Sequence, residues 1–255
     1  MNPQILIYVI NLPRSTARRR ETVARLSALG LDAEIVAACD RADPVPARPS
    51  GAPGLSAAEA ACLRSHAGVL QRVARDSPRL ACILEDDCDL GRPFADVLGA
   101  IVRQDALPWD VLLLGHHSAR HGPGDGAETG FRGAPIIAGY RAARVAEYPM
   151  GAYAYVVTPR GARALVTHAA PPRMPADWVT GYVAATGARL YAVTPPCVRP
   201  LPSTLAPTTI DDRQPRSGRV AAPAAADRSL RTRAARVPLW LRKLGFRPDS
   251  YVRRF

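Results

Sequence analysis

The sequence has no apolar run long enough to cross a membrane. The longest run near the N-terminus is ILIYVI, residues 5–10, and Asn11 and a group of arginines follow it at once. A signal peptide needs an apolar centre of about 7–15 residues with small residues after it, and a membrane helix needs about 20 apolar residues. This segment fits neither, so we expect the chain to stay in the cytoplasm.

Regularly spaced cysteines are also missing. The five cysteines form no CxxC pair and follow no regular spacing: Cys39, Cys62, Cys82, Cys88 and Cys197. Zinc sites and disulfide frameworks are read from such spacing, so the sequence suggests neither a zinc site nor a disulfide framework. We expect reduced thiols that lie mostly in the core.

Lysine and aromatic residues are scarce in this chain. Its net charge is nevertheless +12, which raises the question of nucleic-acid binding. Lys243 is the only lysine, and aromatic residues make up 6% of the chain. Residues 1–210 carry 22 Arg against 18 Asp and Glu, whereas residues 211–255 carry 12 Arg and Lys against 4 Asp. Nucleic-acid binding needs cations and base-stacking aromatics on a structured face. An arginine-rich nucleic-acid-binding protein is therefore only an alternative, and we expect no nucleic acid as a partner.

Apolar runs that alternate with helical patterns predict an α/β domain with a mostly parallel sheet. With 47% hydrophobic residues, a chain of 255 residues can bury a sizeable core. The strand patterns cover 5–10, 33–38, 79–84, 110–115, 151–158 and 189–196. The helical patterns cover 15–30, 55–73 and 176–187, with a short helix opened by Thr158 and Pro159.

Two segments do not fit this alternation. Residues 116–135 are rich in glycine and polar residues and are long enough for a functional loop, in which His116, His117 and His121 could touch a ligand or could be plain loop residues. From residue 200 the chain becomes rich in Pro, Ala and Ser. We therefore expect a folded domain over 1–205 and, over 206–255, a linker with a basic amphipathic tail. Arg together with Leu, Trp and Phe in this tail is typical of a segment on an anionic membrane surface; folding back on the domain is the alternative.

Three adjacent carboxylates, Glu85, Asp86 and Asp87, follow the strand pattern of residues 79–84 directly. In open α/β sheets, ligands bind beyond the carboxyl ends of the strands. Carboxylate oxygens are the ligands that Mg²⁺ and Mn²⁺ prefer, and such an ion would offset the mutual repulsion of the three groups. A solvated acidic turn is the alternative.

Several segments in one fixed order resemble glycosyltransferase family 25, which includes lipopolysaccharide glycosyltransferases. They are INLPRSTAR (10–18), LSAAEAACLRSH (55–66), LEDD (84–87), WDVLLLG (109–115), GAYAYVVTPRGARALV (151–166), PADW (175–178) and TPP (194–196). The resemblance covers roughly residues 4–200. It implies a GT-A type, Rossmann-like nucleotide-sugar-binding domain and an inverting transfer of a hexose, with galactose expected, from a UDP-sugar. The acceptor would be a lipopolysaccharide, a lipooligosaccharide or another surface glycan.

The family's acidic metal motif maps onto Glu85, Asp86 and Asp87. The resemblance implies that Asp87 and Glu85 hold Mn²⁺ or Mg²⁺, while Asp87 and Asp89 offer a competing literal DxD register. The chain departs from the family pattern at Pro13, which affects the expected shape of the first loop, and at Cys88.

The matching motifs also imply a set of donor-binding residues: Asn11, Arg14, Arg18, Glu59, Ser65, His66, Glu85 and Asp86. Arg14 and Arg18 follow the first strand, where guanidinium groups could pair with a diphosphate or stack on uracil. Each role has a structural alternative. The arginines could be a solvated helix face, Glu59 could be the capping-box partner of Ser56, and His66 could be a hydrogen-bonded core histidine.

An inverting transfer needs a base that takes the proton of the acceptor hydroxyl. Asp177 matches the acidic position of the family's late motif and is the predicted catalytic base; an N-cap of the helix over 176–187 is the alternative. An inactive relative that binds a sugar nucleotide without transferring the sugar is a further alternative, which the complete acidic motif disfavours.

Overall fold

The protein is described by a computed structural model over residues 5–43, 55–76, 80–118, 120–122, 125–170, 174–202 and Lys243. The strands are β1 (Ile5–Asn11), β2 (Glu34–Ala37), β3 (Leu80–Glu85), β4 (Cys88–Asp89), β5 (Val111–Leu113), β6 (Thr129–Ile137), β7 (Tyr140–Val145), β8 (Ala154–Val157), β9 (Leu190–Thr194) and β10 (Arg199–Pro200). The helices are α1 (Thr16–Ala28), α2 (Ala57–Asp76), α3 (Arg92–Val102), α4 (Pro159–Ala169) and α5 (Ala176–Tyr182), followed by a short 3₁₀ turn, Val183–Thr186.

One eight-stranded sheet runs through the described domain in the order β2-β1-β3-β8-β5-β9-β7-β6. The pairs β1–β2, β1–β3 and β5–β9 are parallel, and the other four pairs are antiparallel. Six of the eight strands therefore run in one direction, and only β8 and β7 run against them. The sheet is mixed rather than simply parallel, but the carboxyl ends of β1, β3 and β5 share one edge, as the sequence predicts.

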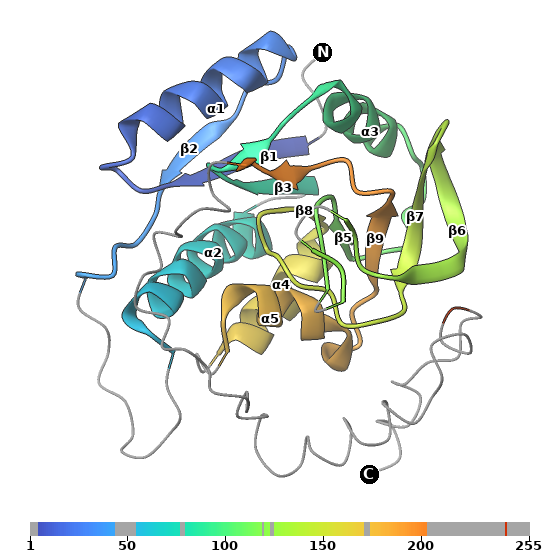
Figure 1. Cartoon of the computed structure of the whole chain (residues 1–255). Helices are drawn as coiled ribbons and strands as arrows, with labels where there is room; N and C mark the ends of the chain where they lie inside the picture. Colours follow the sequence, from blue (N-terminus) through green and yellow to red (C-terminus); the bar gives the residue numbers. More distant parts are fainter. Residues whose placement is uncertain are drawn as a thin grey trace, which may run out of the picture.

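Helices cover both faces of the sheet (Figure 1). Alternate residues of β1 point to opposite faces, so that Ile7 and Val9 join α1 and α3, whereas Tyr8 and Ile10 join α2, α4 and α5. Because both faces are buried, the central strands read as continuous apolar runs rather than as alternating ones. This arrangement confirms the α/β class.

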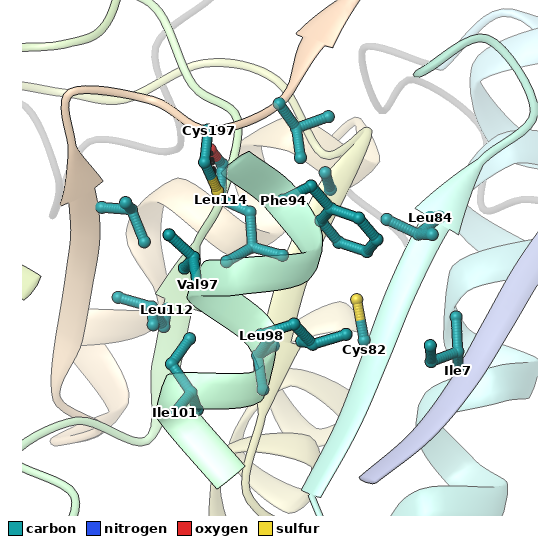
Figure 2. Close-up of a cluster of buried hydrophobic side chains, with 14 of the residues drawn as sticks. Ile7, Cys82, Leu84, Phe94, Val97, Leu98, Ile101, Leu112, Leu114 and Cys197 are labelled. Carbon is teal, nitrogen blue, oxygen red and sulfur yellow. Dashed lines mark hydrogen bonds between the residues drawn. The ribbon is translucent and has the colours of Figure 1, made fainter. Parts of the chain in front are cut away.

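Figure 2 shows how α3 completes one of these layers. Its Phe94, Val97, Leu98 and Ile101 are buried against the side chains of β1, β3 and β5. This helix lies outside the predicted ones, although its apolar residues recur at helical spacing. Gly91 and Pro93 at its start, directly after the acidic motif, make the segment look like a loop in the sequence.

The predicted loop over 116–135 is wrong in its second half. Residues 129–145 form the β6–β7 hairpin, which extends the sheet at one end. Two glycines and a proline in β6 weaken the strand pattern, and the pairing with β7 shifts register twice. The tertiary pairing therefore overrides a sequence that reads as a loop.

The predicted helix ends are largely confirmed. Ser56 and Glu59 form a reciprocal capping box at the start of α2, with hydrogen bonds of 3.0 and 3.1 Å. The Thr158 hydroxyl caps α4 by accepting a hydrogen bond from the Gly161 amide, with Pro159 in the first turn. Gly30 ends α1 with a positive φ of 69°. Ser15 is the N-cap of α1, but its side chain makes no capping hydrogen bond.

The predicted linker and tail, residues 206–255, lie outside the described residues except for Lys243. The part of the chain that the structure describes contains no helix long and apolar enough to span a membrane.

Candidate active site

The acidic motif lies where the carboxyl ends of β1 and β3 meet the start of β8. Glu85 ends β3 in register with Ile10 of β1, and its backbone amide donates a 2.8 Å hydrogen bond to the Tyr153 carbonyl, just before β8. Asn11, the last residue of β1, is therefore beside the motif. Three separate sequence segments converge at this edge of the sheet.

Asp86 points into the protein. Its carboxylate accepts a 2.6 Å hydrogen bond from the Asn11 side chain and a 3.4 Å hydrogen bond from Arg18, while its carbonyl accepts one from the Thr22 hydroxyl at 3.0 Å. Burial raises the pKa of Asp86, and the hydrogen bond from Asn11 opposes that shift. Asp86 thus fixes the first strand and α1 against the acidic turn.

The Asp87 side chain is more exposed than that of Asp86, and nearby cations and hydrogen-bond donors compensate its charge less. Burial, together with the negative charges of Glu85 and Asp86, raises the pKa of Asp87 to about 7. Nη1 of Arg18 is 3.9 Å from its Oδ2. A bound cation would offset this charge.

The C-terminal end of the described domain, β10 and Leu201, holds the backbone of the acidic turn. β4 pairs with β10, which aligns Cys88 with Pro200, and the Leu201 amide donates a 2.8 Å hydrogen bond to the Asp87 carbonyl. On the other side, Arg25 of α1 donates to the Cys88 carbonyl. The turn is thus fixed by segments from both ends of the domain.

Glu85 is linked to a buried histidine. Its Oε1 lies 3.2 Å from Nε2 of His66, and Nδ1 of His66 lies 2.9 Å from the Tyr155 hydroxyl. His66 is buried on α2 and stacks on the Tyr155 ring. Both ring nitrogens therefore have partners, and the histidine orients Glu85.

The residues fit a hard divalent cation. Glu85 and Asp87 keep side chains that are 30% and 23% exposed, whereas Asp86 is 10% exposed and already engaged by Asn11 and Arg18. Oxygen ligands from one or two carboxylates, with the rest from water and substrate phosphates, are what Mg²⁺ and Mn²⁺ require. Glu85 and Asp87 are the two groups that would hold such an ion.

The structure brings some predicted donor-binding residues to the acidic turn and places others further away. Asn11, Arg18 and His66 contact it directly. Arg14 is half-exposed in the loop after β1 and pairs with Asp40, in the segment that follows β2.

Ser65 and Glu59 have structural partners. The Ser65 hydroxyl accepts a 2.9 Å hydrogen bond from the Cys39 amide and donates to the Ala61 carbonyl, which ties the segment after β2 to α2. Glu59 serves the capping box described above. A direct contact of either residue with a donor stays a prediction.

Asp177 lies in the first turn of α5 and is partly buried. The N-cap of that helix is Pro175, so the alternative that Asp177 is the N-cap is wrong. Thr180 donates a hydrogen bond to the Asp177 carbonyl. The assignment of Asp177 as the base stays a prediction.

Tyr153 is a site residue that sequence reasoning missed. Its ring is held between Gly115 and Gly151, where an added Cβ would come within 2.1 and 2.5 Å of ring carbons. Among the described residues, its buried hydroxyl has no hydrogen-bond partner. Burial, and then the negative charges of Glu85 and Asp87, raise the pKa of Tyr153. The sequence signal for Tyr153 was the glycines in the segments GAYAY and WDVLLLG, Gly151 and Gly115, which leave room for its ring.

Two of the three predicted loop histidines have distinct roles. His116 is buried, accepts a hydrogen bond from the Ala127 amide at Nδ1 and donates to the Val193 carbonyl from Nε2; burial lowers its pKa to about 4. It is a neutral structural residue. His117 stacks on Tyr153, and its buried Nδ1 has no partner in the described part of the chain. His117 and Tyr153 thus offer two unsatisfied polar atoms near the acidic turn.

Comparison with known families agrees with this geometry. The model of glycosyltransferase family 25, described as a lipopolysaccharide biosynthesis protein family, matches residues 4–180. The chain belongs to glycosyltransferase family 25. No match is found among curated proteins. Membership of family 25 supports glycosyltransferase activity in lipopolysaccharide biosynthesis, and it implies a sugar donor and a glycan acceptor. The match includes the acidic turn, Tyr153 and Asp177, but ends before β9.

Proposed function

We propose that this family 25 protein is a metal-dependent, inverting glycosyltransferase with a GT-A type domain that transfers a hexose, with galactose expected, from a UDP-sugar to a lipopolysaccharide or lipooligosaccharide acceptor. The observation that carries the proposal is the acidic turn at the carboxyl ends of β1 and β3, with Asp87 open and Arg18 beside it. This is the edge at which α/β sheets bind nucleotides.

The donor end of the site would bind the diphosphate. Arg18 lies between Asp86 and Asp87, with its side chain 33% exposed, so its remaining donors can reach a phosphate. Glu85 and Asp87 would hold Mn²⁺ or Mg²⁺, oriented by His66 and by the β4–β10 pairing. When bound there, the ion supplies Lewis-acid stabilisation of the departing diphosphate.

The proposed transfer is a single displacement. The acceptor hydroxyl oxygen attacks the anomeric carbon of the sugar, a new C–O bond forms, and the bond from that carbon to the diphosphate oxygen breaks. The hydroxyl proton passes to Asp177, and UDP leaves with the electron pair of the broken bond. Attack opposite to the leaving group inverts the anomeric centre.

The acceptor would lie next to Tyr153 and His117. A side-chain rotation would bring their buried, unsatisfied polar atoms to a sugar hydroxyl, and an unsatisfied buried group costs about 1–3 kcal/mol, which that hydrogen bond would relieve. The flanking Gly115 and Gly151 hold the tyrosine ring in place.

The test is a thermal-shift screen of UDP-, GDP- and CMP-sugars with and without Mn²⁺, followed by a transfer assay with the ligands that bind. A ligand that binds only the folded state raises Tm. Stabilisation by a UDP-sugar that requires Mn²⁺ or Mg²⁺ supports the proposal; equal stabilisation by all sugar nucleotides without metal would refute it.

Contact with an anionic membrane on the cytoplasmic side belongs to the same proposal, since a lipid-linked acceptor is presented there. The support is the composition of residues 211–255, where cations alternate with Leu, Trp and Phe. Lys243 lies against the domain: its Nζ is 2.5 Å from Glu128 and 5.4 Å from the centre of the Phe131 ring. At Lys243, this contact favours the alternative in which the tail folds back on the domain.

A further inference from the structure

A cysteine, a histidine and a glutamate meet beside the acidic turn. Cys62 and His66 lie one turn apart on α2, and Glu85 ends the neighbouring β3. The Sγ, imidazole nitrogen and carboxylate oxygen of these residues all lie within 4.8 Å of one another. Residues four apart on a helix share a face, so the helix presents both side chains to the glutamate.

We propose that Cys62, His66 and Glu85 form a second metal site that prefers a thiolate-binding divalent ion such as Zn²⁺. Around one tetrahedral zinc ion, with bonds of about 2.0–2.3 Å, ligand atoms lie roughly 3.4 Å apart. Nε2 of His66 and Oε1 of Glu85 already lie 3.2 Å apart. Small side-chain rotations would bring in the Cys62 sulfur, and water would take the fourth position.

The partners of His66 fit this role. A histidine that binds a metal through Nε2 carries its proton on Nδ1, and that proton needs an acceptor. Nδ1 lies 2.9 Å from the Tyr155 hydroxyl, which is fully buried on β8. The hydroxyl keeps the ring in this orientation, and its oxygen can accept the Nδ1 proton once a metal ion replaces the proton that Nε2 shares with Glu85.

The ligand set separates this site from the proposed Mn²⁺ or Mg²⁺ site. Thiolate and imidazole ligands select zinc, whereas carboxylates and water select magnesium and manganese. On binding, the Cys62 thiol releases its proton to solvent and the sulfur donates an electron pair to the ion.

Among the cysteines, Cys62 suits this role. Burial raises the thiol pKa values of Cys82, Cys88 and Cys197, in the last case to about 12, so these three remain protonated and enclosed. Cys39 and Cys62 are partly exposed, and all five cysteines are free of disulfides. Cys39 lies outside the cluster and is the matched control.

Occupancy of this site would inhibit transfer. Zn²⁺ would draw the Glu85 carboxylate toward Cys62 and His66 and so compete with the ion held with Asp87. This consequence rests on the proposed function; the site itself does not.

The first test uses Co²⁺ as a spectroscopic substitute for Zn²⁺, with no sugar present. The full chain and the Cys39→Ser variant should show a near-ultraviolet thiolate-to-cobalt absorption band that Zn²⁺ abolishes, and Cys62→Ser should lack it. Far-UV circular dichroism and thermal unfolding establish that each variant is folded. Absence of the band from the full chain, or its persistence in Cys62→Ser, would overturn the proposal.

The second test measures Zn²⁺ affinity by competition with a chromophoric chelator. Cys62→Ser should weaken binding by about 100-fold or more, and Tyr155→Phe, which removes the partner of His66 Nδ1, by about 10- to 100-fold. Unchanged affinity in both variants would overturn the proposal.

In transfer assays with Mn²⁺, Cys62→Ser should keep its activity and resist added Zn²⁺. If the cobalt band is present but no transfer occurs with any donor, the proposed function fails and the metal site stands.

Discussion

Three neighbouring carboxylates, Glu85, Asp86 and Asp87, lie in three different environments. Asp86 accepts hydrogen bonds from Asn11 and Arg18, Glu85 is oriented by His66, and Asp87 makes a longer ion pair of 3.9 Å with Arg18. Like charges on adjacent residues repel, so this division of partners is what makes the turn tolerable. Of the three carboxylates, Asp87 is therefore the one to mutate.

Asp87→Ala is predicted to abolish metal-dependent transfer while leaving the fold intact, because it removes a metal ligand and relieves the repulsion from Glu85 and Asp86. Activity with Mn²⁺ or Mg²⁺ and the unfolding curve are the measurements. Asp89→Ala is the matched control, since Asp89 is exposed and belongs to the competing DxD register. Full activity in Asp87→Ala, or loss only in Asp89→Ala, would contradict the assignment.

Asp177→Asn tests the predicted base. The amide keeps the size of the side chain but cannot take a proton, so turnover should fall by ~10²-fold or more while UDP-sugar binding is unchanged. Because Pro175 is the N-cap of α5, the variant should not unfold the helix. Turnover near the wild-type rate would remove Asp177 from the mechanism.

Tyr153→Phe tests the acceptor end of the site. The hydroxyl is buried without a described partner, so its loss should leave Tm unchanged or slightly raised and should increase KM for the acceptor. Kinetics at fixed UDP-sugar with varied acceptor give the answer. A large drop in Tm with unchanged KM would mean that the hydroxyl stabilises the fold instead.

At the scale of elements, local patterns predicted the parts that build the donor end. The apolar run of β1, the capping box of α2 and the acidic turn after β3 are all readable from short stretches, and their convergence follows from parallel pairing. Tyr153, Tyr155 and Cys62 were not identified as site residues. The contacts of Tyr153 and Tyr155 depend on the antiparallel pairing of β8 with β3, which joins residues 70 to 76 positions apart. Cys62 meets Glu85 only because α2 packs beside the end of β3.

The ion pair between β5 and β9 yields a stability prediction. Asp110, buried just before β5, accepts hydrogen bonds from the backbone and side chain of Arg189. Burial opposes ionisation, but these bonds outweigh it and lower the pKa of Asp110. Asp110→Asn should therefore lower the free energy of unfolding by about 2 kcal/mol at neutral pH.

The sign of the pH dependence follows from that lowered pKa. Asp110 stabilises the folded state above its unfolded pKa of about 3.9, and the contribution is lost as pH falls through the lower folded value. Denaturant unfolding of both proteins should give a constant difference from about pH 5 to 8 that shrinks below about pH 4. Asp96→Ala, which breaks an exposed pair with Arg92, is the control and should cost less than about 0.5 kcal/mol. A difference that grows in acid would contradict the assignment.

For the whole molecule, deletion of residues 211–255 separates catalysis from membrane attachment. The truncated protein should transfer to a small soluble acceptor at the normal rate, but bind anionic liposomes less well and act more slowly on a lipid-linked acceptor. Each basic residue near such a surface contributes ~1 kcal/mol, which fades as salt shortens the Debye length. Liposome co-sedimentation at low and high salt is the measurement. Equal binding by both proteins at low salt would refute the anchor.

The position of β9 determines where this chain can be divided. The family match ends at residue 180, yet β9 lies in the middle of the sheet, between β5 and β7, and β10 holds the acidic turn. A fragment cut at the limit of the match would expose the edge of β5, detach the β6–β7 hairpin from β9, and release the backbone of Asp87. The segment that identifies the family thus lacks strands that complete the sheet and hold the acidic turn, and expression fragments should extend at least to residue 202.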